Sequence, residues 1–236
     1  MHISDPWRAV QAAYRLLVQI ARLPLARLRF ELALNPRQVQ AAYRHFTKPH
    51  PRFPVVRNKS LGIALIKLSD FATPDAYRQT MQQKDYAAYH SKKAQARGYT
   101  VAEIDRNRYI DDIYHINTSL TMRQGRPMDA AYLERHEHYE AQQNFRYYGV
   151  LNAKGRLVAY CNIGIYGDFA ATDQVLGYKN NDGVMYLLLM EIVCRLIAEG
   201  KLSYFMYDTY LGAQPGLRSF KQRLGFQPYR IRFSLQ

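Results

Sequence analysis

The chain has 236 residues, of which 48% are hydrophobic, and it carries a formal net charge of +14. This length suits one large domain or two small ones around an ordinary packed core. No run approaches the roughly 18 apolar residues that a membrane-spanning helix needs, and the N-terminus lacks the pattern of a secretory signal. A spanning protein and a simply exported one are therefore excluded, and we expect a cytoplasmic protein. Cys161 and Cys194 lie in apolar runs, which predicts buried, reduced thiols rather than a disulfide.

The positive charge is concentrated at the N-terminal end. Residues 1–60 carry eleven lysines and arginines against two acids, which is +9 of the total of +14. This asymmetry favours a polyanionic partner: tRNA, another anionic carrier, or an anionic membrane surface. A basic surface that serves solubility alone is the alternative.

The first elements in chain order are predicted to be helices. From Pro6 to about Leu23, apolar residues recur at helical spacing and arginines recur every seven residues, which predicts a basic amphipathic helix. Such a helix either lies in a membrane interface or docks on its own domain. A second helix is expected from Arg37 to Phe46, before the proline-rich linker 48–54. We place a boundary there, dividing a basic helical N-terminal segment, 1–54, from a larger domain, 55–236.

The larger domain alternates strands and helices. We predict strands at 60–68, 99–104, 145–151, 156–166, 172–178, 202–207 and 226–234, and helices at 74–97, 106–122, 129–143, 183–199 and 216–224. This order predicts an α/β fold with a mixed, mostly antiparallel central sheet flanked by helices. His136 and His138 are two apart on a predicted helix, so their side chains diverge and no metal site is predicted.

Polar residues are expected to converge near the C-terminus. Asn180, Asn181 and Asp182 precede a helix, Asp208 ends a strand, and Lys221 lies on the next short helix. A cation, a carboxylate and a helix N-terminus in one cleft are typical of acyl transfer, in which an oxyanion must be stabilised. Asp182 as a helix cap and Lys221 as an exposed helix residue are the alternatives.

Two further sequence patterns resemble a known family. The segment Lys92-Lys93-Ala-Gln-Ala-Arg97-Gly98 stands before a predicted strand, and Asp208 is followed by Gly216-Leu217, Phe220-Lys221 and Gly225-Phe226. Residues 86–234 thereby resemble the GNAT acyltransferase superfamily, and more finely its Fem-like branch of aminoacyl-tRNA-dependent transferases. The resemblance implies a GNAT-like fold in which a helix N-terminus receives an acyl donor.

The chemistry of acyl transfer suggests roles for individual residues. Lys221 would stabilise the oxyanion or a phosphate near it. Asp208, or Asp182 at a helix N-terminus, would hold the ammonium of an amine acceptor, and Tyr207 or Tyr210 would protonate the leaving oxygen. Residues assigned to substrate binding are Lys92, Lys93, Arg97, Arg123, Arg126, Asn180, Asn181, Asp182 and Phe220. Arg123 and Arg126, in a loop, would bind an acceptor carboxylate or phosphate, or form only a basic loop.

The donor is expected to be a co-substrate, with no tightly bound cofactor. The glycine-rich loop by which CoA-dependent members hold pyrophosphate is replaced here by Tyr178-Lys-Asn-Asn-Asp-Gly183. Aminoacyl-tRNA is therefore the first choice, acyl-ACP the second and acyl-CoA the third. The alternative is a non-catalytic RNA- or membrane-binding module on a degenerate transferase fold.

Overall fold

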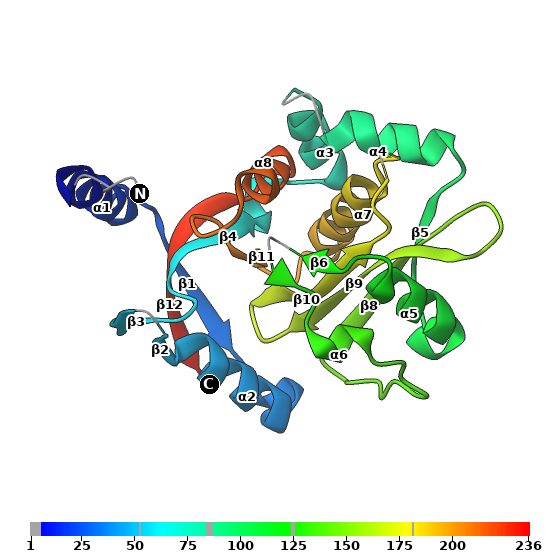
Figure 1. The fold of residues 1–236 in the computed structure, drawn as a ribbon, viewed down its shortest axis with the longest axis horizontal. Helices are drawn as coiled ribbons and strands as arrows, with labels where there is room; N and C mark the ends of the chain where they lie inside the picture. The colour runs from blue at the N-terminus through cyan, green and yellow to red at the C-terminus, as the bar shows by residue number, and fades with distance from the viewer. Residues whose placement is uncertain (1–5, 52, 84–86, 124–125, 181) are drawn as a thin grey trace.

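The computed structural model describes the chain except residues 1–5, 52, 84–86, 124–125 and 181 (Figure 1). The described residues form an eight-stranded sheet in the order β1-β12-β4-β11-β10-β9-β8-β5. Its strands are β1 Leu25–Phe30, β4 Leu61–Lys67, β5 Thr100–Glu103, β8 Phe145–Leu151, β9 Leu157–Ile165, β10 Phe169–Gly177, β11 Tyr204–Thr209 and β12 Gln227–Leu235. Within this sheet β1–β12 and β10–β11 pair in parallel and the other neighbours pair antiparallel.

Helices cover both faces of the sheet, and one further helix, α1, stands apart at the edge of the molecule (Figure 1). They are α1 Pro6–Ala21, α2 Pro36–Thr47, α3 Pro74–Gln83, α4 Ala87–Ala96, α5 Ile110–Thr118, α6 Ala130–Leu133, α7 Val184–Glu199 and α8 Pro215–Arg223, with short 3-10 turns η1 Leu32–Leu34, η2 Leu68–Asp70 and η3 Arg106–Tyr109. Two hairpins complete the fold: β2 Pro49–His50 with β3 Phe53–Arg57, and β6 Met122–Arg123 with β7 Arg126–Pro127. The predicted α/β fold with a mixed sheet is confirmed.

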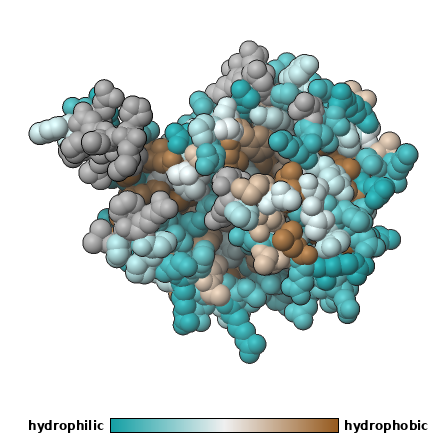
Figure 2. All heavy atoms as spheres, viewed as in Figure 1, coloured by the Kyte–Doolittle hydropathy of each residue, from teal (hydrophilic) through white to brown (hydrophobic). Residues whose placement is uncertain are grey.

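The core lies on both sides of the sheet because side chains alternate along each strand. On β4, Ala64 and Ile66 pack with α3, α4 and α7, whereas Ile63 and Leu65 pack with β1 and α2 on the opposite face. Helix α7 is apolar on most sides and packs across the sheet, as its sequence predicts. In the face shown in Figure 2, hydrophilic residues cover most of the rim and hydrophobic residues show mainly towards the middle.

Strand β1 was not expected from the sequence. Its residues alternate between exposed and buried, and Ala26, Leu28 and Phe30 enter the core while arginines point outward. The predicted helical N-terminal segment therefore contains a strand that pairs with β12 in the main sheet. The linker predicted at 48–54 contains β2 and the start of β3. The domain boundary at residue 54 stays a prediction.

The helix predicted at 129–143 is wrong beyond α6, which ends at Leu133. Backbone groups of the following segment bond to side chains of η3 instead of to each other. Asn107 accepts from the backbone N–H of Tyr139 and donates to its carbonyl, and Arg106 donates to the carbonyl of Glu140. The stretch from residue 134 lacks an apolar stripe that would make a helix preferable. Within the helix predicted at 74–97 the described residues form α3 and α4, and the helix predicted at 106–122 begins as the 3-10 turn η3 and continues as α5 to Thr118.

Both cysteines are buried and free, as predicted. Burial raises the pKa of each thiol, that of Cys194 to about 11, so neither is a nucleophile at neutral pH. Among the described helices none is long and apolar enough to cross a bilayer.

Candidate active site

The two parallel strands β10 and β11 diverge at the centre of the sheet. They pair at three positions, the last being Ala171 with Met206. Just beyond it both strands are irregular where they pair with their other neighbours: β10 bulges between Thr172 and Gln174, and β11 between Met206 and Thr209. A bulge inserts an extra residue and bends its strand. The polar residues Asp173 and Asp208 are thereby placed at the opening.

A cavity of about 230 Å³, which we call the divergence cavity, lies at this opening. It is lined by His45, Phe46, Lys59, Tyr166, Thr172, Asp173, Val175, Met206, Tyr207, Asp208, Thr209, Gly212, Ala213, Leu217 and Lys221. These residues come from α2, the turn before β4, the strands β10 and β11, and α8. The described lining is mixed in polarity and brings together two lysines and two aspartates, which is the composition of a reactive site rather than of core packing.

Lys221 is the most buried charged group of the cavity. The residue is 1% exposed, and its ammonium donates to the carbonyls of Tyr207 at 2.6 Å and Thr209 at 2.7 Å. The same nitrogen lies 4.3 Å from the centre of the Tyr207 ring. Burial lowers the pKa of Lys221, Asp208 counteracts this and Lys59 adds to it, and the pKa falls to about 8. The group is therefore largely protonated at neutral pH, with a third N–H beyond the two held by carbonyls.

Asp208 is held in an uncommon backbone conformation beside Lys221. Its φ of 48° lies in the left-handed region, which few residues other than glycine adopt. Its carboxylate, half exposed, is paired with the ammonium of Lys59. Burial alone raises the pKa of Asp208, but the charge and hydrogen bond of Lys59, with Lys221 and the Thr209 N–H, outweigh it and lower the pKa. Asp208 is therefore ionised throughout the neutral range.

Asp173 faces the cavity from the opposite strand. The residue remains exposed to solvent. Partial desolvation by the neighbouring chain raises the pKa of this carboxyl, partly countered by Arg106. The Arg106 guanidinium is itself held over the rings of Tyr147 at 3.9 Å and Tyr139 at 4.6 Å. The two carboxylates thus differ: Asp208 is kept ionised by a lysine, whereas Asp173 binds a proton more readily. Such a difference separates a charge-pairing role from a proton-accepting role.

A second pocket, the α7 pocket, lies at the N-terminus of helix α7. It has a volume of about 340 Å³ and is lined by His90, Lys93, Tyr178, Asn180, Gly183, Val184, Met185, Tyr186 and Phe220. The first backbone N–H groups of a helix have no partners within it and favour negative charge. Gly183 has a φ of 83°, and a Cβ there would lie 2.2 Å from the carbonyl oxygen of His90. This contact brings α4, with Lys93, against the start of α7.

The charge of Asp182 is compensated by a neighbour. Its carboxylate pairs with Arg97 and accepts a hydrogen bond of 2.9 Å from the Tyr99 hydroxyl. Its backbone N–H donates to the side chain of Asn180. Asp182 therefore ties the loop before α7 to the end of α4, and it does not place an unbalanced negative charge at the helix N-terminus.

The predicted site residues are distributed between the two pockets. Lys221 and Asp208 share the divergence cavity, while Lys93, Asn180 and Phe220 line the α7 pocket. The prediction that Asn180 and Asp182 meet Lys221 in one cleft is therefore wrong for these described residues. Helix α8 contributes to both, since neighbouring residues on a helix point about 100° apart. Arg97 and Asp182 pair beside the α7 pocket, and Lys92 lines a separate hollow with Glu191.

Other predicted residues are placed elsewhere. Tyr210 is 8% exposed, packs in the core, and is not among the described residues that line the divergence cavity. Its part in proton donation stays a prediction, whereas the other tyrosine predicted for this step, Tyr207, lines the cavity. Arg123 and Arg126 pair across the β6–β7 hairpin, but their side chains, like Asn181, lie outside the described residues.

Lys59, Asp173 and His45 line the cavity although the sequence did not indicate them. Lys59 stands in a basic, proline-rich region that reads as a linker, and a β-bulge such as that at Asp173 has no signature in a single sequence. Burial, with Lys48 and Lys59, lowers the pKa of His45, so its imidazole is neutral at pH 7. The described residues contain no group of three His, Cys, Asp or Glu side chains that could hold a metal ion.

Comparison with known proteins gives likenesses of structure. No family model matches the sequence, and no curated protein matches it. Among solved structures, FemX has a TM-score of 0.54 at 10% identity, covering 71% of this chain and 59% of that chain. A C-terminal domain (DUF2156) of a putative lysylphosphatidylglycerol synthetase from Agrobacterium fabrum has a TM-score of 0.49 at 14% identity, with coverages of 70% and 57%. The L-PGS of Bacillus licheniformis has a TM-score of 0.45 at 15% identity, with coverages of 71% and 59%.

The likeness to FemX shows that the chain has a FemX-like fold, which is the fold that the sequence resemblance implied. The chain spans 57% to 59% of the length of these three structures. A fold of this kind hosts different substrates, so activity must be argued from the site.

Proposed function

We propose that this protein is an acyltransferase that passes an acyl or aminoacyl group from an activated carrier to an amine. The observation that carries the proposal is the buried ammonium of Lys221 in the divergence cavity, beside two carboxylates of different pKa. Two of its N–H bonds go to backbone carbonyls, which fixes the nitrogen in place. The third N–H is the donor we assign to the oxyanion that forms when the amine attacks the acyl carbon.

Asp173 is the base we assign to the acceptor. An amine enters as an ammonium ion and must lose a proton before its lone pair can attack. A carboxylate with a raised pKa accepts that proton more readily than Asp208, which Lys59 holds ionised. Asp208 then has an electrostatic role: it keeps the ammonium of Lys221 charged and attracts the incoming cationic acceptor.

Collapse of the tetrahedral intermediate breaks the bond from the acyl carbon to the carrier. The carrier leaves as an oxyanion or thiolate that takes up a proton, for which the Tyr207 hydroxyl is our candidate donor, since Tyr207 lines the cavity. The nitrogen of the intermediate gives up its second proton to the Tyr207 phenolate, which restores the hydroxyl. The products are an amide, the protonated carrier and the proton on Asp173, which passes to solvent. No step requires a tightly bound cofactor.

The α7 pocket is the binding site we assign to the carrier's anionic part. It combines a helix N-terminus with Lys93, and Arg97 neutralises the nearby carboxylate of Asp182. We keep aminoacyl-tRNA as the first donor, acyl-ACP as the second and acyl-CoA as the third. The strongly basic chain supports a large anionic carrier. An accessible cavity around Lys221 supports an enzyme over a binding module on a degenerate fold.

The test is a transfer assay with each donor class against a pool of amines, with mass spectrometry of the products. Lys221→Met keeps the stem and removes the charge, so turnover at saturating substrates should fall by roughly 10² or more. The Asp208→Asn variant should lose less turnover, and a higher concentration of the acceptor should restore part of the loss. The matched control is Gln222→Met on the exposed side of the same helix, which should transfer normally.

Two outcomes would contradict the proposal. Transfer by Lys221→Met at the rate of the Gln222→Met control would remove Lys221 from the chemistry. Absence of transfer with every donor class, together with salt-sensitive tRNA binding, would make the chain a binding module.

A further inference from the structure

Helix α1 stands at the edge of the molecule, away from the layers that form the core (Figure 1). Among its described side chains, Trp7 is 74% exposed and Tyr14 is 68% exposed. Large aromatic side chains at such exposure are unusual unless they meet another surface. The helix is attached firmly at its end, because the backbone and side chain of Arg230 donate to the carbonyls of Pro24 and Leu23 at 2.8 and 3.0 Å.

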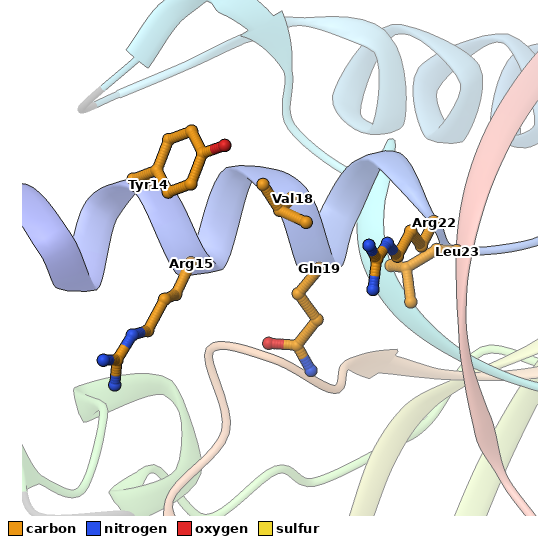
Figure 3. A pocket seen from close by; sticks show the side chains of 6 residues that line it. All are labelled: Tyr14, Arg15, Val18, Gln19, Arg22 and Leu23. Atoms are coloured by element: carbon orange, nitrogen blue, oxygen red, sulfur yellow. The ribbon is translucent and has the colours of Figure 1, made fainter.

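The two sides of α1 differ in character. Figure 3 shows the ring of Tyr14 projecting to one side of the helix and the side chains of Arg15 and Gln19 to the other. A hollow of about 410 Å³ follows the helix, lined by Tyr14, Arg15, Val18, Gln19, Arg22 and Leu23. An aromatic side next to a basic side is the arrangement of a helix that lies in the plane of a membrane interface.

The segment that contains α1 and β1 is strongly positive, because its arginines have no acidic residues among them in the sequence. No Asp or Glu occurs from Pro6 to Phe30, a stretch that holds five arginines. Arg27 and Arg29 point outward from β1, and Arg27 stands directly beside the exposed Arg232 in the parallel register with β12. Like charges paired across strands are unfavourable on their own. An anionic surface held against them would remove that repulsion.

We propose that α1 and the outward face of the β1–β12 edge form a docking surface for a membrane that contains anionic lipids. Phosphate headgroups would meet Arg15, Arg22 and Arg27, and the rings of Trp7 and Tyr14 would enter the interface between headgroups and acyl chains. RNA is the competing polyanion, and its bases can stack on aromatic rings. The aliphatic side chains of Val18 and Leu23 in the same hollow favour a lipid interface. The proposal is independent of the chemistry at Lys221.

The experiment uses the full chain and its own reporter, because Trp7 is the one tryptophan in the sequence. Vesicles of phosphatidylglycerol and phosphatidylcholine in equal amounts should move the emission of Trp7 to shorter wavelength and sediment the protein. Vesicles of phosphatidylcholine alone should do much less. Added salt should weaken binding, since the headgroup attraction is screened.

Variants separate the aromatic from the basic contribution. Trp7→Asp should abolish sedimentation with anionic vesicles. Arg15→Gln with Arg22→Gln should weaken binding by about 30-fold, as expected for two cations near an anionic surface. Gln11→Ala, exposed on the same helix and uncharged, should bind normally. All variants should keep the wild-type melting temperature, because the substituted side chains lie outside the core.

The proposal is overturned if Trp7 emission and sedimentation are unchanged by anionic vesicles at low salt, or if neutral vesicles act equally well. It is also overturned if tRNA binds the wild-type chain, the arginine variants lose that binding, and vesicles fail to compete. That last result would assign the surface to RNA.

Discussion

The divergence cavity and the α7 pocket differ in how their charged groups are held: the cavity contains groups with shifted pKa values, and the α7 pocket contains a cation beside a neutralised carboxylate. The cavity is lined by a lysine that is 1% exposed and has a lowered pKa, and by a carboxylate that has a raised pKa. In the α7 pocket, Lys93 is only half-buried and the nearby Asp182 is paired with Arg97. Groups with displaced pKa values are suited to proton transfer and charge stabilisation, whereas paired and exposed charges are suited to binding. The difference supports the proposed division, with chemistry in the divergence cavity and carrier binding in the α7 pocket.

The backbone shows the same division. Residues around the cavity depart from regular strand geometry, with bulges in β10 and β11 and a positive φ at Asp208. Such positions persist only where the surrounding structure maintains them, and they are concentrated at functional sites. At the α7 pocket, by contrast, the positive φ falls on Gly183, where it has no steric cost.

The largest effect should come from the titration of Lys221. Its pKa is about 8 in the folded chain and near 10.5 when unfolded, so between these values the unfolded state binds more protons. The free energy of unfolding therefore rises with pH in this window, by about 3 kcal/mol in total. The free energy of unfolding, measured by urea denaturation from pH 7.5 to 10.5, should rise more for the wild type than for Lys221→Met. The variant lacks the titration of Lys221 but keeps the other titrating groups, so the difference reports on Lys221.

The same titration should limit activity. As pH rises through about 8, Lys221 loses the proton that stabilises the oxyanion, so turnover should decline above that pH. Equal slopes of stability against pH for the wild type and Lys221→Met would show that Lys221 keeps an ordinary pKa, and the contrast between the two pockets would lose its main support.

A second effect, of about 10², is expected on turnover for Asp173→Asn, because the amide cannot accept the acceptor's proton. The wild-type rate should fall at low pH as Asp173 becomes protonated, and this acidic limb should be absent in the variant. Asp111→Asn, which removes an exposed carboxylate paired with Arg135, is the control. A variant that keeps the acidic limb would mean that another group is the base.

Sequence patterns were sufficient for the fold class and for part of the cavity. Helix α7 follows from an apolar run that ends at Gly200, and the meeting of Lys221 with Asp208 follows from the order of strand and helix around it. These elements are local, and their hydrophobic periodicity states which side is buried. Strand β1 was missed because alternating arginines obscure its short apolar side.

The rest of the site depends on contacts that are distant in sequence. Lys59 reaches Asp208 across 149 positions, and it does so because β4 lies between β11 and β12. Asp173 reaches the cavity because β10 bulges where β11 turns away. Neither the pairing of a charge nor the place of a bulge is recorded in the local pattern of residue types, so three-dimensional structure was needed for both.

The smallest effect should distinguish the α7 pocket from the cavity most directly. Lys93→Gln removes one cation from the wall of the α7 pocket, so the KM for an anionic donor should rise by about fivefold, the value of a partly exposed ion pair. Turnover at saturating donor should be unchanged, because the charge acts equally on bound substrate and transition state. The slope of binding against salt should fall by roughly one counterion if the carrier is a nucleic acid.

Lys92→Gln is the matched control, since the Lys92 side chain lines a different hollow beside Glu191, and the substitution should leave KM unaltered. If Lys93→Gln lowered turnover at saturation instead, the α7 pocket would share in the chemistry, and the separation of the two pockets by function would be wrong.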